Sequence, residues 1–200
     1  MKTKLFISIF FSFLVLVSSL ANGSSNPIVL KSDNGNFDGY SANSTTHQVE
    51  PKYQIMKIFD ISQEDLDGVV EAKVRLYMGL IDFSLARNGF LEDMQLVVNG
   101  NIVTVPLDQF DHGKRRGQLP VYEWCDITIP YKYLKAGENK VIVKKAKGTT
   151  EDDYVYVAID NSISYGKSAC SMDDGKTWNY EKLNAINAKG EYGIRLVLFK

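Results

Sequence analysis

Polar and apolar residues alternate along much of the chain, and this alternation constrains the fold more than any other feature. In EAKVRLYM, residues 71–78, the apolar residues at even positions from Ala72 to Met78 fall on one side, and the four intervening residues fall on the other. Because successive side chains of a strand point to opposite faces, a period of two predicts strands with one buried face. The pattern recurs in VYEWCDITIP, in DDYVYVAID and in the C-terminal EYGIRLVLF.

Turn signals separate these segments. Asn99-Gly100 predicts a tight hairpin, because both residues tolerate a positive φ. Ser62 followed by Asp65 predicts a short helical turn with Ser62 as its N-cap. We therefore expect an all-β antiparallel sandwich or jelly roll of about eight or nine strands. The apolar last strand, within 191–199, is expected inside a sheet and not at its edge.

The N-terminus has the pattern of a secretory signal peptide. Lys2 and Lys4 precede an uncharged, mostly apolar run from Leu5 to Val17, and Ser19-Leu20-Ala21 is a small-x-small cleavage signal. The run is shorter than the roughly 20 residues that a membrane span needs. We expect residues 1–21 to be removed and residues 22–200 to form one domain without a membrane span, secreted to the periplasm or the cell exterior.

The net charge and the number of cysteines limit which partners this protein can bind and which covalent bonds it can form. The formal net charge is −1, and removal of Lys2 and Lys4 with the signal peptide makes it −3. Such a balance does not favour nucleic acid, which selects basic surfaces. The two cysteines, Cys125 and Cys170, leave two alternatives open: a disulfide, as secretion permits, or two small buried thiols.

Two longer passages carry a family resemblance. LEDMQLVVNGNIVTV and VYEWCDITIPYKYLKAGENKVIVKK resemble the galactose-binding-domain-like jelly roll, with its V-N-G turn and its I-P-x-x-x-L-x-x-G-x-N passage. The likeness spans about residues 69 to 199 in pattern. Such domains occur as carbohydrate-binding modules and as accessory domains of glycosidases. The resemblance implies the sandwich fold and a glycan or polysaccharide partner.

The octapeptide SMDDGKTW resembles the Asp-box of sialidases. The matching residues are Ser171, Asp173, Gly175, Thr177 and Trp178. In such a loop the Asp side chain accepts backbone N–H groups, and Gly takes a positive φ. Sialidases carry several copies around a propeller, whereas this chain has one. We therefore interpret the motif as a structural turn with Trp178 as its apolar anchor, the alternative being a loop that also contacts ligand, and we do not predict a sialidase.

Candidate glycan contacts come from loops and aromatic residues. DQFDHGKRRG, residues 108–117, concentrates charge that could bind a hydroxyl or acidic group of a sugar, as could Arg87 and Asn88 in another loop. Exposed aromatic rings could stack on a sugar face, although aromatic residues also serve as core. The predicted ligand-binding residues are His112, Arg115, Arg116, Arg87, Tyr122, Trp124 and Trp178.

A calcium site is a further expectation. NGNFDG, residues 34–39, offers Asn36 and Asp38 as oxygen ligands, but Thr45 stands where an EF-hand requires Glu. The family resemblance suggests a smaller oxygen cage between this loop and the last strand, to which Glu191 would contribute. The alternative is an Asn- and Gly-rich surface turn.

These observations favour a non-catalytic carbohydrate-binding protein. The sequence contains no G-x-S-x-G, H-E-x-x-H or Gly-rich phosphate loop, and only two histidines. Two alternatives remain. One is a small polysaccharide lyase or glycoside hydrolase on the same sandwich, and the other is a structural or partner-binding module without a sugar site.

Overall fold

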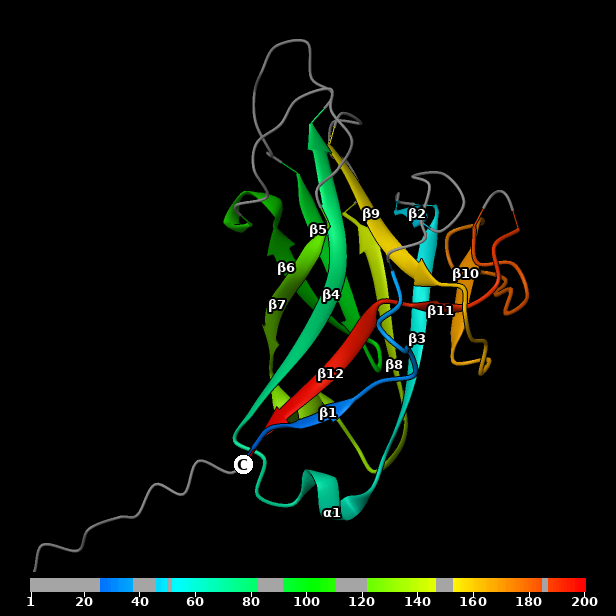
Figure 1. Cartoon of the computed structure of the whole chain (residues 1–200). Coiled ribbons are helices and arrows are strands. Elements are labelled where there is room, and N and C mark those ends of the chain that lie inside the picture. The colour runs from blue at the N-terminus through cyan, green and yellow to red at the C-terminus, as the bar shows by residue number, and fades with distance from the viewer. Residues whose placement is uncertain are drawn as a thin grey trace, which may run out of the picture.

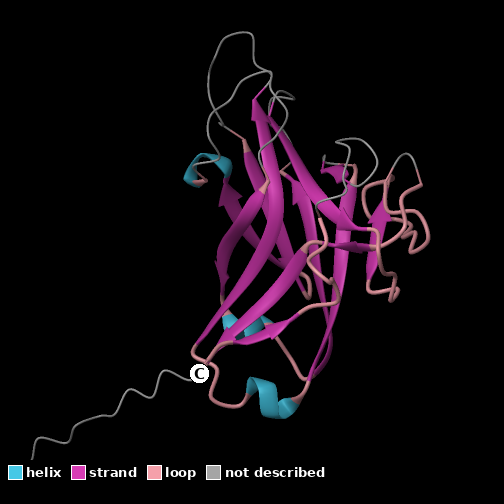
Figure 2. Ribbon diagram, viewed as in Figure 1, coloured by secondary structure: helices cyan, strands magenta, loops and turns pink. Residues whose placement is uncertain are grey.

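Two antiparallel sheets pack face to face in the computed structural model (Figures 1 and 2), which describes residues 26–37, 46–49, 52–82, 92–110, 122–146, 153–184 and 187–200. The prediction of an all-β antiparallel sandwich is confirmed. Within these ranges there are twelve strands. The sequence predicted fewer, because β1 (Ile28–Leu30), β2 (Thr46–Val49) and β10 (Ser168–Ser171) have too few residues to establish a period of two. In addition, β11 (Glu191–Tyr192) was predicted as part of the last strand.

The first sheet is built around β4 (Glu71–Asp82). One edge of β4 pairs with β7 (Glu123–Ile129), and the other pairs first with β12 (Ile194–Phe199) and then with β9 (Asp153–Asp160). The strand β12 lies between β1 and β4, so the last strand is internal, as predicted. The remaining strands of this sheet are β1 (Ile28–Leu30), β2 (Thr46–Val49) and β11 (Glu191–Tyr192).

The second sheet has the order β10-β3-β8-β5-β6. Its hairpin between β5 and β6 turns at Asn99 and Gly100, whose φ angles are 50° and 87°, as predicted. Its strands are β3 (Gln54–Ile61), β5 (Asp93–Val98), β6 (Asn101–Pro106), β8 (Gly137–Lys145) and β10 (Ser168–Ser171).

Short helical segments connect the strands. The helix α1 (Gln63–Leu66) begins with the expected capping box, in which Ser62 and Asp65 exchange hydrogen bonds. Two 3₁₀ turns, Leu107–Gln109 and Tyr131–Tyr133, follow β6 and β7. In the described part of the chain no helix is long and apolar enough to cross a membrane.

The core lies between the sheets, where alternate residues of each strand meet. Leu76 of β4, Leu96 of β5 and Leu196 of β12 are all completely buried there. The sequence pattern of VYEWCDITIP did not decide which face of this strand is buried. In the structure, Cys125, Ile127 and Ile129 face the core. The aromatic side of that strand consequently faces outward.

Candidate functional site

The outer side of the first sheet carries a cluster of aromatic side chains. Tyr77 on β4, Trp124 on β7 and Tyr156 on β9 pack there with Phe37, which follows β1, and with Tyr122, which precedes β7. The strand register accounts for this grouping, because Tyr77 lies directly opposite Trp124, and the residue opposite Tyr156 is two positions from Tyr77. We call these five residues the outer aromatic cluster.

Three rings of the outer aromatic cluster, those of Phe37, Tyr77 and Trp124, contact one another. The Phe37 ring stacks on Tyr77 with centroids 4.7 Å apart and meets the edge of Trp124 at 5.8 Å, while Tyr77 and Trp124 are 5.2 Å apart. Phe37 and Tyr122 are buried, whereas Tyr77, Trp124 and Tyr156 keep part of their surface in solvent. VYEWCDITIP contains two of the predicted ligand-binding residues. Of these, Trp124 is accessible to a ligand, whereas Tyr122 is buried and packs within the cluster.

A glycine makes this packing feasible. A Cβ atom at Gly193, between β11 and β12, would lie 2.9 Å from Cβ of Tyr77 and 3.1 Å from Cζ of Phe37. The first of these distances is shorter than real Cβ contacts, and the second is tighter than most of them, so a side chain at this position would require Tyr77 or Phe37 to move.

A row of charged residues adjoins the cluster. The guanidinium of Arg195 on β12 lies 4.1 Å from the centroid of the Trp124 ring, which is cation–π distance. Its Nε donates to Oδ2 of the buried Asp33 at 3.1 Å. On the next strand, Arg75 lies opposite Arg195 and binds Asp126 of β7 with two bonds of 2.6 and 2.9 Å.

These pairs determine the charge of the row. The hydrogen bond from Arg75 holds the pKa of Asp126 below its ordinary value, and the same bond raises the pKa of Arg75. Asp33 and Asp126 each bind one of the two guanidinium groups, so the two adjacent arginines of β12 and β4 are each paired with one carboxylate. The outer side of the sheet thus offers aromatic faces beside fixed polar groups without a large net charge.

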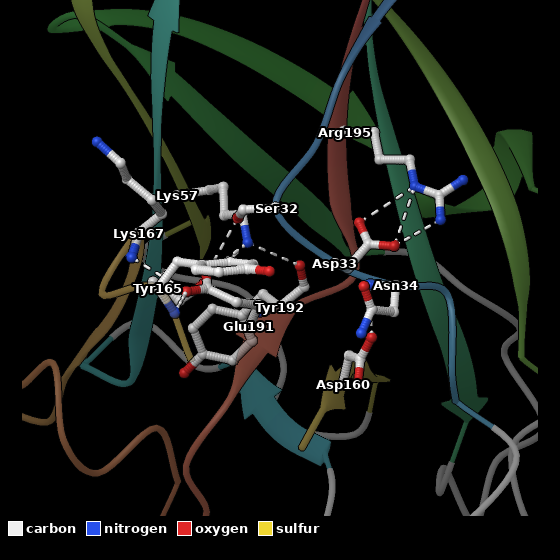
Figure 3. Close-up of polar contacts among 11 residues, drawn as sticks. Ser32, Asp33, Asn34, Lys57, Asp160, Tyr165, Lys167, Glu191, Tyr192 and Arg195 are labelled. Atoms are coloured by element: carbon white, nitrogen blue, oxygen red, sulfur yellow. Dashed lines mark hydrogen bonds and ion pairs between the residues drawn. The ribbon is translucent and has the colours of Figure 1, made fainter. Parts of the chain in front are cut away.

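Glu191, predicted as a calcium ligand, lies in a buried ion pair (Figure 3). Lys57 occupies a core-facing position of β3 between Ile55 and Phe59, and its Nζ is 2.7 Å from Oε2 of Glu191 in the opposite sheet. The same ammonium donates to Oγ of Ser168 and to the carbonyl of Tyr192. A protein cation therefore satisfies the carboxylate in the place where the sequence predicted a metal ion.

Further hydrogen bonds hold the Glu191 carboxylate. It accepts the backbone N–H groups of Tyr165 and Lys167 at 2.7 and 3.1 Å and the hydroxyl of Ser168 at 2.6 Å. Burial by itself raises the pKa of Glu191, but the charge of Lys57 and the hydrogen bonds together outweigh it, and the pKa lies below its ordinary value. Burial also lowers the pKa of Lys57 in spite of its partner.

The segment that contains Asn36 is held by a second carboxylate. Oδ2 of Asp160 accepts the backbone N–H of Asn34 at 2.7 Å and that of Asn36 at 3.4 Å. Among the residues that the structure describes, no three carboxylate, imidazole or thiol groups converge to hold a metal ion. Asp38 lies outside these residues, so the calcium site stays a prediction.

The segment from Ser171 to Thr177 forms a compact turn after β10. Oδ1 of Asp173 accepts the N–H of Thr177 at 2.9 Å, and Oδ2 accepts its hydroxyl at 2.8 Å. The Ser171 hydroxyl accepts the N–H of Gly175, whose φ is 78°. The bonds from Thr177 lower the pKa of Asp173 to about 2. These contacts are those of a structural turn.

Trp178, also predicted to bind ligand, packs against the other sheet. It is half-buried against Met56, Ile58 and Ala169 on the outer side of β3 and β10. The two tryptophans therefore do not form one site. Beside Trp178, the turn borders an open pocket of about 310 Å³, whose lining includes Met172, Thr177, Asn179, Lys182, Asn184 and Asn187.

The two cysteines are free and buried. Cys125 lies on β7 of the first sheet and Cys170 on β10 of the second. Burial raises the pKa of Cys125 to about 12 and that of Cys170 to about 11. Of the two alternatives, the structure contains the buried thiols and not the disulfide.

The remaining predicted contacts, Arg87, His112, Arg115 and Arg116, lie outside the described residues. Conversely, sequence reasoning missed Phe37, Tyr77 and Arg195 as members of the candidate site. A signal existed for Tyr77, which alternates with buried residues in EAKVRLYM. No protein-family model matches the chain, and a search of curated proteins finds no match either.

Proposed function

We propose that this chain is a secreted, non-catalytic carbohydrate-binding protein and that the glycan lies against the outer aromatic cluster. The observation that carries the proposal is the grouping of three partly exposed aromatic rings beside two buttressed arginines on one side of a sheet. A sugar ring presents apolar C–H faces and polar hydroxyl edges. Tyr and Trp combine a rigid apolar face with a polar tip and therefore suit such a ligand.

Preorganisation supports the same proposal. Trp124 contacts Phe37 and Tyr77 on the sheet, and Arg195 is held over its ring by the buried Asp33. Side chains held by packing and by hydrogen bonds lose little conformational entropy when a ligand binds. A rigid, hydroxyl-rich ligand then gains affinity from contacts that exist before it arrives.

The charge pairing indicates the class of sugar. Each arginine of the described row already neutralises a carboxylate, Arg195 with Asp33 and Arg75 with Asp126. A strongly anionic glycan would have to compete with these carboxylates for the guanidinium groups. We therefore propose neutral glycans as the preferred ligands of this face.

A glycan array with residues 22–200 tests the proposal. We expect binding to neutral glycans, and we expect Trp124→Ala to weaken it by about fivefold or more, because loss of an aromatic contact costs on the order of 1 kcal/mol or more. Trp178→Ala is the matched control, since Trp178 is half-buried on the opposite sheet, and it should keep the affinity. Trp124→Phe, which preserves an aromatic ring, separates lost stacking from lost folding.

Other outcomes would change the proposal. If a folded sample binds no glycan on a broad array, the result would support the structural or partner-binding alternative. Binding that Trp178→Ala abolishes and Trp124→Ala preserves would move the site to the pocket beside the turn. Release of saccharide products from a bound polysaccharide would support the lyase or hydrolase alternative, and loss of binding in a chelator would support the calcium prediction.

A further inference from the structure

A second buried lysine lies at one end of the sandwich. Lys145 is the last residue of β8, Glu92 precedes β5, and Asp153 is the first residue of β9. All three are buried, with exposed fractions of 3%, 2% and 0%. The register brings Lys145 opposite Met94 in the second sheet, while Asp153 belongs to the first sheet, whose strands β4 and β9 meet near the top of the ribbon in Figure 1.

The contacts join these three residues closely. The ammonium of Lys145 forms an ion pair with Oε2 of Glu92. It also donates to the backbone carbonyl of Asp153 at 2.7 Å. The Asp153 carboxylate in turn accepts the backbone N–H of Glu92 at 3.1 Å. Asp153 therefore holds both the amine and the segment that carries the carboxyl group.

The surroundings of Glu92 differ from those of Glu191. Glu191 accepts hydrogen bonds from hydroxyl and backbone N–H groups in addition to Lys57, and these bonds stabilise its charge. For the buried carboxyl oxygens of Glu92, the described residues provide the ion pair with Lys145 and no hydrogen bond. A buried ion pair without further hydrogen bonds recovers little of the free energy lost when both charges leave water.

We propose that Lys145 and Glu92 condense to an amide, an isopeptide bond between Nζ of Lys145 and Cδ of Glu92. One proton passes from the ammonium to the carboxylate, which gives an amine and an acid. The nitrogen lone pair attacks Cδ, the C–N bond forms, and one C–O bond breaks. The departing oxygen takes a second proton from the nitrogen and leaves as water, so the reaction needs no oxidant, reductant or cofactor.

The geometry favours this condensation for three reasons. The reacting groups are in contact, which gives a high effective concentration. The site is shielded from bulk water, whose presence favours hydrolysis. The product replaces two buried charges, and a carboxyl oxygen to which the described residues donate no hydrogen bond, with one neutral amide. Asp153 acts as a positioning residue, through its carbonyl toward the amine and through its carboxylate toward Glu92.

The bond would tie β8 to the start of β5 and close a covalent loop from residue 92 to residue 145. A cross-link of this length restricts the unfolded chain and stabilises the folded one. The two thiols of this protein are free, so the amide would be a covalent staple that does not depend on a disulfide. This inference is independent of the proposed glycan binding.

Mass spectrometry of the denatured protein, residues 22–200, tests the proposal directly. We expect an intact mass one water molecule below the sequence mass, and a proteolytic digest in which the peptides that contain Glu92 and Lys145 are joined. An intact mass equal to the sequence mass, with both peptides free, would overturn the proposal. The readout does not require that any variant folds.

Three variants separate the cross-link from other losses of water. Lys145→Met should restore the full mass, whereas Lys57→Met, which changes the other buried lysine of the described residues, should retain the deficit. Glu92→Gln should lose ammonia in place of water and give a product with the mass of the cross-linked wild type. A deficit that persists in Lys145→Met, or that disappears in a folded Lys57→Met protein, would contradict the assigned bond.

Discussion

Lys57 is a charged residue at a core position, and the core accommodates its charge because of one partner, Glu191. Its side chain and that of Glu191 have no exposed surface, and the two lie 134 residues apart in the chain. Each charge needs the other, because an unpaired buried charge strongly destabilises the folded state, whereas a paired one changes the free energy of folding little. The pair as a whole therefore adds little to the net stability, because the loss of hydration offsets the attraction between the two charges.

Removal of one partner should be strongly destabilising. We expect Glu191→Gln to lower the free energy of unfolding by about 3–5 kcal/mol, because it leaves the Lys57 ammonium buried without its counter-charge. Urea denaturation measures this value. Asp60→Asn is the control, because it removes the partner of Lys167 in a largely exposed pair, which contributes about 0–1 kcal/mol. Equal effects of the two substitutions would contradict this account.

The turn after β10 is an element whose stability depends on a single carboxylate. Asp173 accepts three hydrogen bonds from Ser171 and Thr177, and these lower its pKa from 3.8 to about 2. The contribution of the group to stability is present above the unfolded pKa and is lost as pH falls through the folded pKa. The turn should therefore loosen between about pH 4 and pH 2.

An NMR titration of the Asp173 carboxyl carbon measures this directly. We expect a midpoint near 2 in the wild type. Thr177→Val removes the hydroxyl donor and keeps the backbone bond, so it should shift the midpoint upward. A wild-type midpoint at the ordinary value of 3.8 would show that these bonds are absent in solution.

Local pattern was sufficient for several elements and insufficient for others. The hairpin at Asn99-Gly100 and the capping box at Ser62 depend on residues within a few positions, and both predictions are confirmed. The strand β7 was recognised, but its inward face was not, because apolar and aromatic residues alternate on it. Only its pairing with β4 decides that Trp124 lies on the outer side beside Tyr77.

At the scale of the whole molecule, the intact sandwich protects both thiols. Cys125 and Cys170 are buried in different sheets, and burial raises their pKa values to about 12 and about 11. We expect neither thiol to react with a thiol-specific reagent at pH 8 in the native protein. Both should react after denaturation without a reductant, because no disulfide links them. Fewer than two reactive thiols in the denatured chain would indicate oxidation or pairing.

The sequence by itself determined the class of fold, the strand periods, the tight hairpin and the short capped helix, because each depends on neighbouring residues. Tertiary structure alone decided which residues meet. Asp33 and Arg195 are 162 residues apart, yet together they position the cation over Trp124. Lys57 lies in a mostly apolar segment, and its sequence neighbours do not indicate that Glu191 is its partner. The sequence instead suggested Glu191 as a metal ligand. A period of two specifies a face but not the strand opposite, and sheet register determines the partner.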